Sequence, residues 1–197
     1  MCARSTCTAS VSGARPTLWF MTDDDMKPSD RLYYGIASIR GWDEALREAR
    51  HYGGNYNTRV GRVLSSLLLA GGENSEPVAV GGTLNDDGDG HLIVIYPDLA
   101  VFGRAQKLSA YGGEVTVTVH SLDEIDKLQV STEHNYYDGT TDYARHSGIT
   151  VGLTLDGAQL KLTGTSYSRS PLSTDAAVLT TLELLRSRRA RQAQATS

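Results

Sequence analysis

From Pro77 onward the apolar residues of this chain recur at every second position, and this period constrains the fold more than any other feature. A period of two places alternate side chains on opposite faces of a β-strand. Turn-forming residues such as Asp156-Gly157 separate the runs, which predicts short antiparallel strands arranged as a barrel or sandwich. Seven strands are expected, at about residues 77–84, 91–97, 99–105, 114–120, 125–132, 148–155 and 158–164.

Helical spacing precedes the strands. Residues 30–52 and 58–70 carry apolar side chains three and four positions apart, which predicts amphipathic helices. Gly41 is expected to break the first helix into two pieces, and Gly71-Gly72 to end the second.

A terminal helix is expected to follow the last strand. Ser170-Pro171 interrupts the strand pattern, and residues 173–189 then show helical spacing, with Ser173 or Thr174 as the N-cap. Its apolar stripe consists of Val178, Leu179, Leu182 and Leu185. The predicted fold class is therefore α+β.

Four segments follow from these periods. Residues 1–29 have no sustained hydrophobic period and are predicted to be disordered. Residues 30–72 form a helical segment, residues 73–190 the strand domain with its terminal helix, and residues 191–197 a disordered tail.

The charge of the chain is unevenly distributed. The formal net charge is −4, but six of the 19 basic residues lie in the two ends, which leaves 13 against 23 acidic residues in between. Such a body repels phosphate backbones and anionic lipid, so membrane binding is not expected and nucleic-acid binding is disfavoured. The six basic residues in the two ends of the chain are Arg4, Arg15, Arg186, Arg188, Arg189 and Arg191.

The two cysteines, Cys2 and Cys7, precede the region with a hydrophobic period, so neither a disulfide framework nor a thiolate metal site is expected. The turn at residues 85–90 matches the opening of a calcium loop, but Tyr96 stands where that loop needs a glutamate. An acidic hairpin turn is the preferred interpretation, with no metal or cofactor. No apolar run reaches membrane-spanning length, and a cytoplasmic protein is expected.

Over about residues 64–189 the chain resembles the bacterial pleckstrin-homology-like (PH-like) domains. The resemblance rests on the helix end at 67–73, the hairpin from His91 to Arg104, the segment 122–125, and the ribbon 148–162 leading into the terminal helix. It implies a seven-stranded barrel capped by a C-terminal helix, acting as a binding or scaffolding module without catalytic residues. Lipid-binding members carry basic residues around the first hairpin loop, whereas this loop is acidic, so phosphoinositide binding is not expected.

The segment 133–147 carries the main functional hypothesis. Tyrosines among small polar residues are typical of surfaces that bind proteins. This long connection is either a binding loop for a protein partner or a second copy of the chain, or an insertion whose tyrosines fold back over the barrel. The proposed contact residues are His134, Tyr136, Tyr137, Tyr143, Arg145 and His146.

Two functions of other classes remain as alternatives. An enzyme or small-molecule-binding protein would use His134 and His146 with nearby carboxylates, although no nucleophile or metal motif is present. A nucleic-acid-binding protein would use residues 50–62 and the arginine-rich tail.

Overall fold

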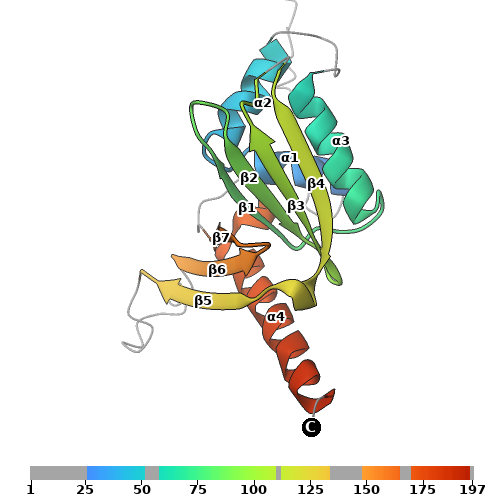
Figure 1. Cartoon of the computed structure of the whole chain (residues 1–197), viewed down its shortest axis with the longest axis vertical. Helices are drawn as coiled ribbons and strands as arrows, with labels where there is room; N and C mark the ends of the chain where they lie inside the picture. Colours follow the sequence, from blue (N-terminus) through green and yellow to red (C-terminus); the bar gives the residue numbers. More distant parts are fainter. Residues whose placement is uncertain (1–25, 52–57, 110–111, 134–147, 165–169, 196–197) are drawn as a thin grey trace, which may run out of the picture.

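The computed structural model describes residues 26–51, 58–109, 112–133, 148–164 and 170–195 (Figure 1). Within these residues the chain is α+β, as predicted, with four α-helices, two short 3₁₀ helices and seven strands. The helices are α1 (Pro28–Ile36), α2 (Trp42–His51), α3 (Arg59–Gly71) and α4 (Asp175–Ala195), with the 3₁₀ helices η2 (Leu122–Glu124) and η4 (Pro171–Ser173). The strands are β1 (Ala79–Leu84), β2 (Gly90–Ile95), β3 (Leu99–Gln106), β4 (Glu114–Ser121), β5 (Lys127–Thr132), β6 (Ile149–Leu155) and β7 (Ala158–Thr163).

The seven strands form two antiparallel sheets. One sheet has the order β1-β2-β3-β4 and the other the order β5-β6-β7, so every strand pairs with its neighbour in sequence. All seven predicted strands are confirmed within a few residues. In the described part of the chain no strand of one sheet pairs with a strand of the other, so the strands form two sheets and not one closed barrel.

The four-stranded sheet is the middle layer of the molecule. Side chains alternate along β2, so Leu92, Val94 and Tyr96 pack under the helices α1–α3. Ile93 and Ile95 point to the other face, where the three-stranded sheet and α4 cover them. We call the face that carries Ile93 the inner face and the face that carries Leu92 the outer face.

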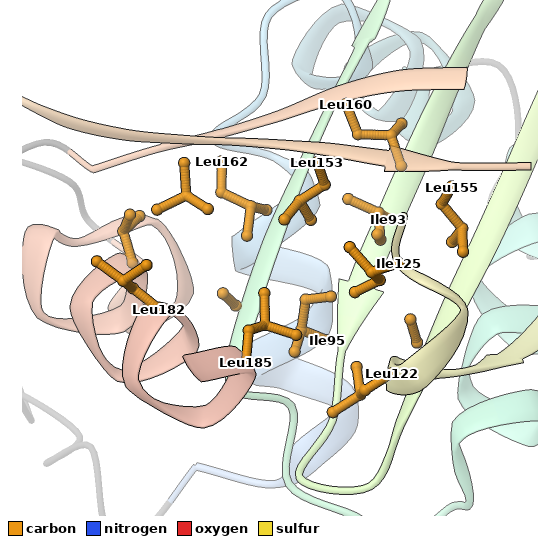
Figure 2. Packing of buried hydrophobic residues seen from close by; sticks show 14 of the residues in the cluster. Ile93, Ile95, Leu122, Ile125, Leu153, Leu155, Leu160, Leu162, Leu182 and Leu185 are labelled. Atoms are coloured by element: carbon orange, nitrogen blue, oxygen red, sulfur yellow. The ribbon is translucent and has the colours of Figure 1, made fainter. Parts of the chain in front are cut away.

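Figure 2 shows the core on the inner face. Leu153 and Leu162 from the three-stranded sheet meet Leu182 and Leu185 of α4, with Ile95 of the four-stranded sheet beside them. The terminal helix is therefore part of the core, and its predicted apolar stripe supplies buried residues.

The start of α4 agrees with the prediction, but its end does not. The Thr174 hydroxyl accepts a hydrogen bond from the Ala177 amide at 3.2 Å, as an N-cap does. The helix continues to Ala195, beyond the predicted end at residue 189, so residues 191–195 are helical where a disordered tail was predicted. The reason is composition, because residues 190–195 are alanine, arginine and glutamine, which are strong helix formers.

The helical segment and the strands share one core. Gly41 has a φ of +84° and separates α1 from α2, which confirms the predicted break. Trp42, the first residue of α2, is buried on the outer face, and its indole N–H lies 3.3 Å from the carbonyl oxygens of Thr83 and His91. Residues 30–72 are therefore packed on the sheet and do not form a separate unit.

Strands β1 and β7 lie side by side where the two sheets meet. A Cβ atom at Gly81 would lie 2.5 Å from the carbonyl oxygen of Lys161, so only glycine permits this close approach. β7 therefore packs closely on the inner face of β1.

Candidate functional site

The three-stranded sheet crosses only one half of the inner face (Figure 1). Over the other half the inner face lines an open cleft of about 1590 Å³. Its walls come from β1–β4, the β1–β2 and β3–β4 connections, the start of α3 and the β6–β7 turn at Asp156-Gly157. This cleft is the candidate functional site.

A row of polar side chains crosses the floor of the cleft. Thr83 is paired with His91, His91 with Arg104, and Arg104 with Thr116, so one residue from each of the four strands lies in register. Directly opposed residues in antiparallel strands share a face, which places all four on the inner face. We call these four residues the polar row.

Next to the polar row the floor becomes apolar. Phe102 and Thr118 are opposed to each other in β3 and β4, and both line the cleft. Phe102 also belongs to the core below the three-stranded sheet, so its ring marks the boundary between core and cleft.

His91 of the polar row is partly buried beside an aromatic ring. Its ring lies 6.4 Å from the ring of Phe102, and burial lowers the pKa of His91 below the usual 6.5. The imidazole is therefore neutral at pH 7 and offers a ligand one hydrogen-bond donor and one acceptor.

The turn between β1 and β2 forms one rim of the cleft. Asn85 Oδ1 accepts a hydrogen bond from the Asp89 amide at 2.8 Å, and Asp89 Oδ1 accepts one from the Lys107 amide at 2.8 Å. These side chains hold the hairpin and tie it to the β3–β4 connection. Within the residues that the structure describes, no group of three or more His, Cys, Asp or Glu side chains could hold a metal ion.

The charges around the cleft are mixed. Three basic residues and three acidic residues line it, and no described residue forms an ion pair with any of the basic ones. The basic residues are Arg59, Arg104 and Lys107, and the acidic ones are Asp89, Glu114 and Asp156. The cleft thus offers charges of both signs to a ligand.

A second polar group lies at the end of β4. His120 Nδ1 lies 2.9 Å from Glu124 Oε2, and His120 Nε2 lies 2.9 Å from the Thr118 hydroxyl. The hydrogen bond from His120 lowers the pKa of Glu124, and a smaller contribution in the same direction comes from the hydrogen bond of the Ser121 amide.

The order hydroxyl, imidazole, carboxylate is one in which an imidazole can take a proton from a hydroxyl. The same carboxylate also stabilises the local structure, because Glu124 and Ser121 form the capping box of η2. The group fixes the turn at which the chain leaves one sheet for the other.

The six partner-binding residues predicted from the sequence, His134, Tyr136, Tyr137, Tyr143, Arg145 and His146, lie outside the described residues. The strands that flank them are described. The Glu133 amide donates to the Gly148 carbonyl at 3.2 Å, and the Gly148 amide donates to Asp175 Oδ1 at 3.1 Å, at the start of α4. These anchors and the Asp156-Gly157 turn lie at opposite ends of β6.

The described residues of the nucleic-acid alternative do not form one group. Arg59 lines the cleft, and residues 52–57 lie outside the described residues. Arg188 donates to the Pro97 carbonyl at 3.0 Å, and Arg189 to the carbonyls of Ile125 and Asp126 at 3.0 and 3.1 Å. Two of the tail arginines therefore fasten α4 to loops of both sheets.

Sequence reasoning missed the polar row and the Thr118–His120–Glu124 group. A signal for the row was present in the sequence. On the inner face of β2 the residues change along the strand from apolar, Ile93 and Ile95, to polar, His91. Those of β3 change from Ala100 and Phe102 to Arg104. Both changes occur at the same level of the sheet, but the pairing register is needed to see this.

Comparison of the chain with known protein families, with curated proteins and with solved structures found no match. The described helices include none with the length and apolar character needed to span a bilayer.

Proposed function

We propose that this chain is a non-enzymatic interaction module with a PH-like arrangement, and that the cleft binds a polypeptide partner. The observation that carries the proposal is the polar row, which runs across four strands on the floor of an open cleft. A cytoplasmic location stays a prediction from the sequence.

The order of the elements supports the PH-like arrangement. Four antiparallel strands precede three more, and a C-terminal helix packs against strands of both sheets. The expected seven-stranded barrel would need pairing between the sheets, so the proposal concerns the arrangement of layers and not closure.

The chemistry of the cleft favours a polypeptide over an anionic head group. A polypeptide presents backbone donors and acceptors as well as side chains of either charge, which suits Arg104, His91 and the two threonines of the polar row. A phosphoinositide would meet the carboxylates of Asp89 and Glu114 in the same cleft.

Arg104→Glu tests this proposal. Peptides selected for binding from a random library would be titrated against the purified chain. We expect R104E to weaken the selected peptides about tenfold or more, because a charge-assisted hydrogen bond is worth about 1.5–3 kcal/mol.

Arg40→Glu is the matched control. It makes the same charge change at an exposed residue between α1 and α2, outside the cleft, and should leave peptide affinity unchanged. Equal affinity of wild type and R104E for every selected peptide would contradict the proposal.

The tyrosine-rich segment 133–147 stays a proposal for a second contact. Because its anchors lie at the far end of β6 from the cleft, a partner that used both would have to span the three-stranded sheet. Replacing Tyr136, Tyr137 and Tyr143 together by serine should weaken such a partner while peptides that fill only the cleft bind as before. If a protein partner that co-purifies with the chain binds this triple variant as tightly as wild type, the segment does not belong to the binding site.

A further inference from the structure

Strand β4 is an open edge of the four-stranded sheet in the described part of the chain. β4 pairs with β3 on one side only, and η2 then turns the chain into the other sheet. At the opposite side of the same sheet, β7 packs on the inner face of β1 at Gly81. An edge strand presents unpaired N–H and C=O groups that another strand can use.

The sequence of β4 lacks the usual protection of an edge. Residues 115–119 are five β-branched residues in succession, with no lysine or proline among them. Every residue of β4 pairs with a residue of β3 without a bulge. The ladder runs from the Glu114–Gln106 pair at one end to the Ser121–Leu99 pair at the other. Val119 is 53% exposed, so an apolar side chain of β4 is open to solvent.

We propose that β4 pairs antiparallel with β4 of a second copy of this chain, about a two-fold axis at Val117. The inference goes beyond the proposed cleft function and does not depend on it. In this register Val115 lies opposite Val119 of the second copy, and Thr116 lies opposite Thr118. Valines then meet valines on the outer face, and threonines meet threonines on the inner face.

The ends of the strand are compatible with this register. Glu114 at the start of β4 comes opposite His120 of the second copy near its end, so the two Glu114 carboxylates do not face one another. A slip by one residue would place valines opposite threonines and turn one copy over relative to the other. The self-complementary register selects a second copy as the occupant of the edge.

Pairing at β4 would join the four-stranded sheets of the two copies into one sheet of eight strands. Thr116 of each polar row would then neighbour Thr118 of the second copy, and the two clefts would open onto one another. The dimer would therefore present two copies of the binding floor on a continuous surface.

Sedimentation velocity of the full chain, without peptide, tests the proposal. Wild type should sediment as a concentration-dependent dimer, and Val119→Lys should raise the dissociation constant about tenfold or more, because it sets a charge opposite valine in both halves. Val130→Lys is the matched control, since Val130 is also 53% exposed but lies on β5, and this variant should remain dimeric.

A second variant guards against a loss of folding. Glu114→Lys changes an exposed residue of the edge strand and should also weaken the dimer, because a lysine on an edge disfavours pairing with another strand. In a sample that mixes differently labelled copies, NOEs between the methyl groups of Val115 and Val119 would report the register. A wild-type chain that stays monomeric at every concentration, or a V119K variant that dimerises like wild type, would overturn the proposal.

Discussion

Tyr96 shows how a single buried group can be left without a partner. The side chain is 1% exposed, and its hydroxyl has no hydrogen-bond partner among the described residues. Burial raises the pKa of Tyr96 to about 12. A Cβ atom at Gly71 would collide with the phenol ring, so the end of α3 rests on this tyrosine.

Removing this hydroxyl should stabilise the protein. We expect Tyr96→Phe to raise the free energy of unfolding by about 1 kcal/mol, because an unsatisfied buried polar group costs about 1–3 kcal/mol. Urea unfolding followed by circular dichroism measures the change. Tyr34→Phe, at a tyrosine that is 47% exposed, should change stability by less than about 0.5 kcal/mol. A clear loss of stability in Y96F would show that the hydroxyl has a partner.

At the scale of elements, the strands could be predicted because their signal is local. Strand β2 carries apolar side chains on both faces, Leu92 and Val94 on one and Ile93 and Ile95 on the other. The turn residues around it mark where the strand begins and ends. The break at Gly41 was also local, since a positive φ there suits glycine alone.

The cleft could not be predicted in the same way. It exists because the three-stranded sheet covers only half of the inner face, and this depends on how the two sheets cross. The polar row likewise depends on the register between strands that are up to 33 positions apart, as Thr83 and Thr116 are. A sequence pattern shows which residues share a strand face but not which residues of different strands lie level.

The terminal helix offers a prediction at this scale. Leu182 is buried between α4 and the inner-face core, and Leu182→Ala should lower the free energy of unfolding by about 2–5 kcal/mol through lost burial and a cavity. Glu183→Ala, one residue along on the exposed face of α4, is the control and should change it by less than about 0.5 kcal/mol. If L182A unfolds at the urea concentration of wild type, α4 does not contribute to the core as described.

At the scale of the whole molecule, one sheet has two different inner halves. The half that carries Ile93 and Ile95 is closed by the three-stranded sheet and α4 and supplies the core. The half that carries His91 and Arg104 is open and polar. Helices α1–α3 pack on the outer face, so stability and binding are assigned to different regions of a continuous set of strands.

His91 lies in the open half beside Phe102, and it should make the stability of the whole molecule depend on pH. Its pKa in the folded protein is below 6.5, so as the pH falls through 6.5 the unfolded chain takes up a proton that the folded chain does not. The folded state therefore loses stability below pH 6.5, until the pH passes the lowered pKa of His91.

His91→Gln should remove this part of the loss. Urea unfolding of wild type and H91Q at pH 7.5 and at pH 5.5 gives the comparison, because the other histidines contribute equally to both proteins. We expect the free energy of unfolding to fall further in wild type than in H91Q between the two values. An NMR titration of the His91 ring gives an independent check, and a midpoint at or above 6.5 would show that the imidazole is solvated and that the floor of the cleft is more open than described.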